Sequence, residues 1–209
     1  ARYYGDPKKN DLGNREDVDK VLSQITGKPF TVQSVKKTQR RKNPAPPFIT
    51  SSLQQEASRK LNLTPKRTMM LAQQLYEGVE LREEGSVGLI TYMRTDSLRI
   101  SEEALAAAGE VIRSRYGEKY YPGQPRRYKP KANAQDGHEA IRPSNVALYP
   151  ELVEHDLTKD QYRLYKLIWN RFIASQMENA VYDVTAIEAA CENQVFRATH
   201  QSVAFAGFT

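Results

Sequence analysis

GLITYMRTDS, residues 88–97, is the stretch around which this chain is organised. It begins with a short apolar run, Leu89-Ile90, and continues with arginine, threonine, aspartate and serine. A short apolar run is typical of a buried strand or the start of a turn, whereas the polar cluster behind it is incompatible with a core. Tyr92 is therefore expected at this boundary, with its ring anchored and its hydroxyl among charged groups.

Tyr92 and Arg94 form a pattern suited to phosphate chemistry. A phenol has a pKa of about 10 and is a poor nucleophile unless a cation or base favours the phenolate. Arg94 would lie on the same side of an extended segment and offer a planar fork to a phosphate, with Asp96 holding the guanidinium. The chain has 12 tyrosines, however, and a tyrosine is more often a packing residue, so the spacing alone leaves both roles open.

The stretch resembles the active-site tyrosine segment of type IA DNA topoisomerases. A methionine directly after the tyrosine, here Met93, resembles the bacterial topoisomerase I branch of that family. Two further stretches resemble the family in the same order: APPFITSSLQQ, residues 45–55, and AQDGHEAIRPS, residues 134–144. The resemblance covers nearly the whole chain, more weakly in the first thirty residues. It implies that Tyr92 cleaves one DNA strand through a transient 5′-phosphotyrosine link, so that negative supercoils relax without ATP.

His138 lies in the third of these stretches. His138-Glu139 suggests a zinc protease, but the second histidine required four residues later is Arg142, which excludes that class. A lone histidine is more often structural, whereas the resemblance implies that His138 contacts the DNA phosphate beside Tyr92. An imidazole that becomes charged near neutral pH suits that place. Arg142 is expected to be either a second phosphate contact or a salt-bridge strut.

Gln73 and Glu77 share one side of a helix that ends shortly before the tyrosine stretch. The resemblance implies that they approach the cleavage site, and a solvated helix face is the alternative. Tyr76 is expected on the inward side of the same helix. The expected catalytic residues are therefore Tyr92, Arg94 and His138, with Thr95, Asp96, Gln73 and Glu77 in support.

The charge distribution agrees with a nucleic-acid partner. The net charge is +6 and the isoelectric point is near 9.3, which is compatible with nucleic acid but common in other basic proteins. Two basic runs would neutralise several phosphates and make binding strongly dependent on salt. The expected DNA-binding residues, besides Arg142, are Lys36, Lys37, Arg40 and Arg41 in the first run and Arg126 and Arg127 in the second, which continues with Lys129 and Lys131.

The composition sets further limits. At 209 residues, with 39% hydrophobic and 27% charged residues, the chain suits one large or two small folded domains. It has no apolar run of membrane-spanning length and does not start like a signal peptide. The single cysteine, Cys191, excludes an internal disulfide framework. We expect a reducing, cytoplasmic setting, with the chromosome, and no membrane.

Periodicity and capping residues predict both helices and strands. A strand is expected at residues 30–35, ended by the basic run and the proline-rich residues 43–47. Five capped helices are expected, starting after Asn14, Ser51 or Ser52, Thr64, Ser101 and Thr158, with a few charged residues inserted at 79–86. A hairpin is expected from residue 181 to 200. The fold class is therefore α+β and multidomain: a helical, winged-helix-like domain, residues 52–179, inserted into a β-rich hinge domain, residues 1–51 and 180–209.

The resemblance also implies parts that this chain lacks. No clustered Asp-x-Asp-x-Glu occurs, so no metal site is expected here, and the Mg²⁺ of the full enzyme would be bound by an absent amino-terminal domain. We expect a central fragment whose partners are single-stranded DNA, that amino-terminal domain and a gate domain, and which relaxes no supercoils alone. Two alternatives remain: a non-catalytic single-stranded nucleic-acid-binding module, and another tyrosine transesterase such as a recombinase.

Overall fold

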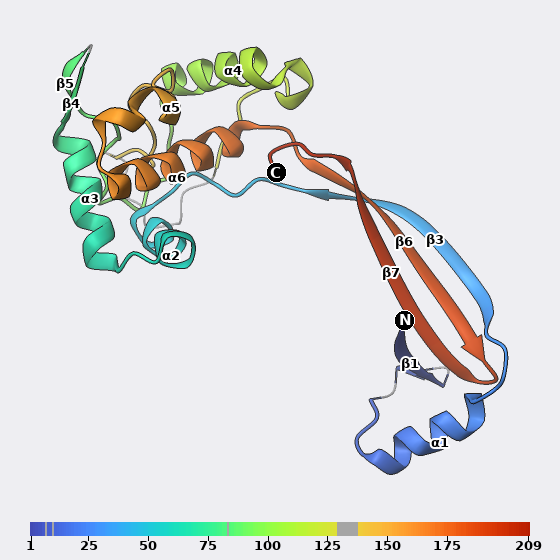
Figure 1. The fold of residues 1–209 in the computed structure, drawn as a ribbon. Helices are drawn as coiled ribbons and strands as arrows, with labels where there is room; N and C mark the ends of the chain where they lie inside the picture. The colour runs from blue at the N-terminus through green and yellow to red at the C-terminus, as the bar shows by residue number, and fades with distance from the viewer. Residues whose placement is uncertain (7, 10, 83, 129–137) are drawn as a thin grey trace. The chain divides into compact units, whose positions relative to one another are not determined.

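The computed structural model describes residues 1–6, 8–9, 11–82, 84–128 and 138–209 (Figure 1). The chain divides into two compact units, one of residues 1–42 and 180–206 and one of residues 43–179 and 207–209. Residues 43–51 thus group with the helical unit, whereas the sequence placed them with the β-rich part. Lys129, Lys131 and residues 134–137 lie outside the described residues. No described helix is long and apolar enough to cross a membrane.

The first unit is built on an antiparallel sheet with the strand order β2-β1-β7-β6-β3. Its strands are β1 (Arg2–Asp6), β2 (Lys8–Lys9), β3 (Thr31–Lys42), β6 (Ala180–Cys191) and β7 (Gln194–Phe205). The expected hairpin is confirmed as β6–β7. Helix α1 (Arg15–Ile25) is capped by the side chain of Asn14 but has no buried residue.

Strand β3 is longer than expected, because the basic run does not end it. Its register with β6 continues from Thr31 to Lys42, with one irregularity between Val32 and Ser34. Backbone hydrogen bonds to β6 therefore maintain the strand where its own composition favours a loop, and the prediction that it stops at residue 35 was wrong.

The second unit is mainly helical. Its helices are α2 (Thr50–Leu61), α3 (Pro65–Glu77), α4 (Glu102–Tyr116), α5 (Pro150–Val153) and α6 (Lys159–Gln176), with short 3₁₀ turns η1 (Glu118–Tyr120) and η2 (Glu154–Asp156). A small hairpin, β4 (Val79–Leu81) and β5 (Gly85–Val87), occupies the region expected to hold only inserted charged residues. The α+β class is confirmed.

The capping predictions hold for four of the five helices, including the Asn14 cap of α1. The side chains of Thr64, Ser101 and Thr158 each accept a backbone N–H at the start of α3, α4 and α6. For α2 the prediction was wrong. The cap residue is Ile49, and the hydroxyl of Ser52 reaches back to accept its N–H at 3.0 Å.

Helix α6 forms the centre of the core of the helical unit. Its aromatic residues Tyr165, Trp169 and Phe172 are at most 3% exposed. The Tyr165 hydroxyl donates to the Leu148 carbonyl at 2.6 Å, and Trp169 Nε1 donates to the Val146 carbonyl at 3.0 Å. Burial of each such ring stabilises the unit by about 2–3 kcal/mol, and the two hydrogen bonds tie the loop before α5 to this core.

Candidate active site

Three segments that are distant in the sequence meet around the tyrosine stretch. Phe48 pairs with Ile141 and Ile90 pairs with Pro143 in isolated antiparallel bridges. Both Phe48 and Ile141 have no exposed surface. The segments that resemble the family are therefore hydrogen-bonded neighbours as far as they are described.

Thr50, at the start of α2, holds the segment beyond Tyr92. Its hydroxyl donates to the Met93 carbonyl at 2.8 Å and accepts from Thr95 N at 2.9 Å. Its own N–H donates to the Thr95 carbonyl at 2.9 Å. Thr95, predicted as a supporting residue, is 7% exposed and lies inside this backbone network.

Side chains alternate in exposure along the tyrosine stretch. Tyr92, Arg94 and Asp96 are exposed, whereas the residues between them are buried. Met93, with no exposed surface, anchors the segment in the core. Tyr92 and Arg94 thus share the solvent side, as the sequence pattern predicts. Within the described residues, no ion pair joins Asp96 to Arg94, so the supporting role of Asp96 stays a prediction.

The Tyr92 ring is in contact with two other aromatic rings. Tyr76, from the last turn of α3, approaches it edge-on with ring centroids 5.4 Å apart. His138 lies with its ring centroid 5.5 Å from that of Tyr92, at an interplanar angle of 35°. Tyr92 is 36% exposed, so its ring is restrained while its side chain stays accessible. The structure therefore places His138 beside the tyrosine.

Tyr76 departs from its expected inward position. It is 41% exposed and contacts the Tyr92 ring instead of the core. Helical spacing placed it on the inward face, but the last turn of α3 extends past the core to the tyrosine stretch. The Gln73 amide donates to the Glu77 carboxylate along the exposed side of the same helix. These two residues contact each other on a solvated face, and their predicted role near the cleavage site is untested.

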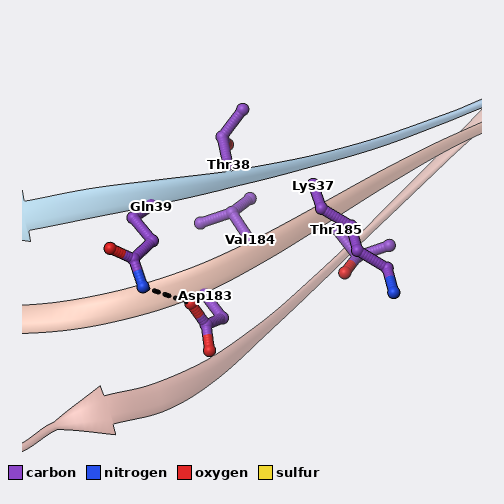
Figure 2. Close-up of a pocket in the computed structure, with 6 residues that line it drawn as sticks. All are labelled: Lys37, Thr38, Gln39, Asp183, Val184 and Thr185. Carbon is purple, nitrogen blue, oxygen red and sulfur yellow. Dashed lines mark hydrogen bonds between the residues drawn. The ribbon is translucent and has the colours of Figure 1, made fainter.

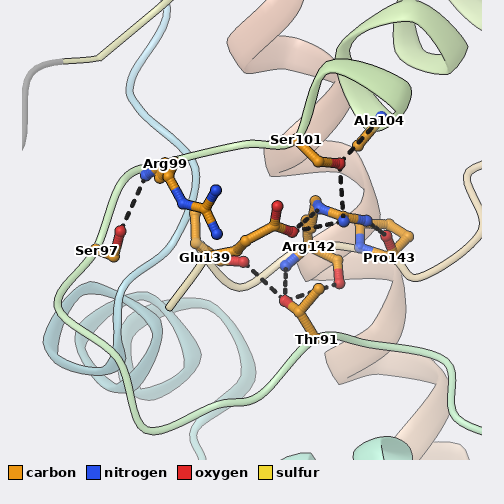
Figure 3. Close-up of polar contacts among 9 residues, drawn as sticks. Thr91, Ser97, Arg99, Ser101, Ala104, Glu139, Arg142 and Pro143 are labelled. Carbon is orange, nitrogen blue, oxygen red and sulfur yellow. Dashed lines mark hydrogen bonds and ion pairs between the residues drawn. The ribbon is translucent and has the colours of Figure 1, made fainter. Parts of the chain in front are cut away.

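Arg142 is committed to internal contacts (Figure 3). Its Nη2 and Nε donate to Glu139 Oε2 at 2.6 and 3.0 Å, and its Nη1 donates to the Pro143 carbonyl at 2.8 Å. The side chains of this ion pair are 12% and 17% exposed. The arrangement supports the salt-bridge strut over the phosphate contact, because the guanidinium already uses most of its donors within the protein.

The two basic runs differ in structure. Arg126 donates to the Met177 carbonyl at 2.8 Å and to Asn179 Oδ1 at 2.7 Å, and it is partly buried. Arg127 forms a two-pronged ion pair with Glu102, at 2.7 and 2.8 Å, which lowers the pKa of that carboxyl. Both arginines predicted to bind DNA are therefore engaged with the protein itself.

Four basic residues of β3 make no such ion pairs within the described part of the chain, although Arg40 lies over the Tyr182 ring, 5.7 Å from its centroid. Lys36, Lys37, Arg40 and Arg41 are all exposed, and among the described residues none of them forms an ion pair. Figure 2 shows the middle of the strand, where Gln39 donates to Asp183 at 3.0 Å near Lys37. Side chains alternate between the faces of a strand, so basic residues lie on both faces.

The described residues do not fit a resident metal ion. Among them, no group of three or more histidine, cysteine, aspartate or glutamate side chains gathers closely enough to hold one. Mg²⁺ is usually held by carboxylates together with water or phosphate oxygens. We therefore assign no catalytic step of this chain to a metal.

The sequence did not single out Thr91, although it is central to the site. Its hydroxyl donates to the Ala140 carbonyl at 2.7 Å and accepts from Arg142 N at 3.0 Å (Figure 3). Its position next to the predicted nucleophile was the available signal. Threonine is so common, however, that residue type alone does not distinguish this role.

Comparison with known proteins agrees with this geometry. A family model described as DNA topoisomerase matches residues 4–209. The solved structure of full-length topoisomerase I from Thermotoga maritima is 37% identical in sequence, with a TM-score of 0.80. That match covers 96% of this chain and 32% of the Thermotoga chain, so the chain spans about a third of that protein's length. The chain belongs to the bacterial type IA DNA topoisomerases.

Proposed function

We propose that this chain is the nucleophile-bearing part of a topoisomerase that cleaves and rejoins one strand of DNA. The placement of His138 beside an accessible Tyr92, with ring centroids 5.5 Å apart, is the observation that carries the proposal. Family membership supports DNA as the substrate. In this proposal, the unit of residues 43–179 is the tyrosine-bearing domain and the β-rich unit is a hinge domain.

The proposed reaction conserves the phosphodiester bond energy. The Tyr92 oxygen attacks a backbone phosphorus, a tyrosine–phosphate bond forms, and the bond from phosphorus to the 3′ oxygen of the neighbouring nucleotide breaks. The phenolic proton leaves and the released 3′ oxygen takes up a proton. The reverse attack of that hydroxyl restores the strand and frees Tyr92. Since one ester replaces another, ATP is not required.

We assign roles by charge and position. Arg94, on the same exposed side as Tyr92, would bind a phosphate oxygen through its guanidinium fork. An imidazolium at His138 would stabilise negative charge that develops on the same phosphate. Lys36, Lys37, Arg40 and Arg41 of β3 would bind the DNA backbone elsewhere. Acting on chromosomal DNA in the cytoplasm, the full enzyme would take its Mg²⁺, gate and amino-terminal segments from outside this chain.

The decisive experiment tests whether labelled DNA becomes covalently attached to the protein. The full-length gene product that contains this chain is mixed with Mg²⁺ and single-stranded DNA labelled at its 3′ end, then denatured. A 5′-phosphotyrosine link keeps the 3′ label on the protein, whereas the 3′ link expected of a recombinase would keep a 5′ label. We expect only the 3′ label to be retained, and Tyr92→Phe to abolish it.

Tyr76→Phe is the matched control, because it removes a neighbouring phenol hydroxyl and keeps the ring. It is expected to form the adduct. If wild-type protein forms no adduct but still binds single-stranded DNA in a salt-sensitive way, the binding-module alternative replaces the proposal. We expect the 209-residue chain alone to relax no plasmid, and relaxation by it would contradict the assignment of further parts of the reaction to other segments.

A further inference from the structure

We propose that the Thr91 hydroxyl is a positioning group that holds Tyr92 and His138 side by side. Because this role presupposes that Tyr92 is the nucleophile, it rests on the proposed function. Thr91 would not touch the reacting phosphate. It would act by joining the two backbone segments that carry the reacting side chains.

The hydroxyl of Thr91 both donates and accepts a hydrogen bond, and both partners lie in the neighbouring segment that includes Ala140 and Arg142. Thr91 Oγ1 donates to the Ala140 carbonyl at 2.7 Å and accepts from Arg142 N at 3.0 Å (Figure 3). The backbone adds a third bond, from Thr91 N to the Arg142 carbonyl at 2.9 Å. A side chain of the same shape without the hydroxyl would leave the Ala140 carbonyl and the Arg142 N–H without these partners.

The segment that Thr91 holds is fixed from its other sides as well. Ala140 N donates to the Arg99 carbonyl at 2.8 Å, and Ile141 N donates to the Phe48 carbonyl at 2.8 Å. Ala140 and Ile141 have no exposed surface. The point from which the chain leads back to His138 is therefore part of the packed core.

Thr91 lies close to Tyr92 in the sequence, and its hydrogen-bond partner Ala140 lies close to His138. Tyr92 directly follows Thr91, and His138 stands two residues before Ala140, whose carbonyl the hydroxyl holds. Tyr76 restrains the Tyr92 ring from α3, but it does so by ring contact at 5.4 Å. A displacement of about 1 Å between reacting groups can cost on the order of 100-fold in rate. The Thr91 hydroxyl is thus placed to control the rate of strand cleavage more than the affinity for DNA.

The test compares Thr91→Val with Thr91→Ser in the full-length gene product. Valine keeps the shape and removes the hydroxyl, whereas serine keeps the hydroxyl and removes a methyl group. The single-turnover rate of adduct formation and the Kd for the same labelled oligonucleotide are measured for each. We expect Thr91→Val to slow the reaction by about 10- to 100-fold with little change in Kd, and Thr91→Ser to stay close to wild type.

A second measurement reports on geometry without activity. In protein labelled with ¹³C at the histidine ε1 position, the His138 resonance is assigned with a His138→Gln variant. Tyr92→Leu shows where that resonance lies without the neighbouring phenol ring. We expect Thr91→Val to move the resonance towards that position and Thr91→Ser to leave it in place. If Thr91→Val does not fold, Thr91→Ala replaces it under the same criteria.

The outcomes separate this role from the proposed function. Wild-type rate and resonance position in Thr91→Val, or equal losses in Thr91→Ser and Thr91→Val, would overturn the positioning role. An absence of adduct in the wild-type protein would overturn the proposed function instead. In that case the histidine resonances still decide whether Thr91 holds the two rings together.

Discussion

Gly88 shows how closely the tyrosine stretch approaches helix α3. A Cβ atom at this position would lie 2.7 Å from the Tyr76 carbonyl oxygen, which is a steric clash. The next residue, Leu89, donates its N–H to the Leu75 carbonyl at 2.7 Å. Glycine is required here for close approach, so the last turn of α3 and the strand leading to Tyr92 are docked backbone to backbone.

Gly88→Ala is expected to lower the free energy of unfolding by about 1–3 kcal/mol, because a backbone carbonyl must move to admit the new methyl group. Urea denaturation of the full-length gene product measures the change. Gly13→Ala is the control, since its Cβ would meet only Asp17 Oδ2 at 3.9 Å. That variant should stay within about 0.5 kcal/mol of wild type. Equal losses in the two variants would contradict a special requirement for glycine at residue 88.

Tyr128 links the pH of the solution to stability. Burial raises the pKa of its phenol to about 12, and its hydroxyl donates to the Ser175 carbonyl at 2.7 Å. The unfolded phenol titrates near pH 10. Between these values the unfolded state has lost its proton while the folded state keeps it, so the contribution to stability is complete below pH 10 and decreases as the pH rises towards 12.

As the pH rises in alkaline solution, Tyr128→Phe should therefore lose less of its free energy of unfolding than wild type does. At pH 8 it is expected to be less stable than wild type by about 0.5–1.5 kcal/mol, the usual contribution of a hydrogen bond. The difference should shrink as the pH rises above 10. Urea denaturation at intervals from pH 8 to 11.5 gives both profiles, and parallel profiles would rule out a raised pKa at Tyr128.

At the scale of elements, strand β3 is the candidate backbone-binding surface. It lies at the edge of its sheet and pairs with β6 along its length. Lys36, Lys37, Arg40 and Arg41 are exposed and, within the described part of the chain, form no ion pairs. Arg126 and Arg127, in contrast, are engaged with acidic and polar partners. Exposed edge strands also carry charge to prevent pairing with other chains, so binding must be measured.

Replacement of Lys36, Lys37, Arg40 and Arg41 by glutamine tests this surface. Each phosphate that the protein no longer neutralises should reduce the salt slope of single-strand binding by about 0.7, so the slope should fall by up to about 2.8. A control with glutamine at Arg15, Lys20, Arg59 and Lys60 removes the same charge from helices α1 and α2. The control should keep the wild-type slope when log Kd is plotted against log salt. Equal slopes in both variants would show that β3 contributes to binding only through the net charge of the protein.

Elements that depend on adjacent residues were predictable. The caps at Thr64, Ser101 and Thr158 are local hydrogen bonds that the sequence pattern specifies by itself. The start of α2 and the end of β3 were mispredicted, because distant partners decide them. Thr50 is held by Thr95, and β3 is continued by its pairing with β6.

At the scale of the whole molecule, the chain forms two units, each built from two separate stretches of the sequence. The change of period from helices to the β6–β7 hairpin made this arrangement predictable, because binary patterning reports which face of each element is buried. The boundary near residue 43 was less predictable. A proline-rich connector has no period, and the contacts of residues 43–51 depend on the folded helical unit.

The sequence by itself determined the α+β class, the capped helices, the hairpin and the exposed alternation of Tyr92 and Arg94. These follow from periodicity and short-range hydrogen bonds. Only the tertiary structure decided that His138 lies beside Tyr92, that Tyr76 turns away from the core, that Arg142 pairs with Glu139, and that Thr91 joins the segments that carry Tyr92 and His138. Each of these depends on contacts between residues far apart in the chain, and no local pattern specifies which partners the packed core will bring together.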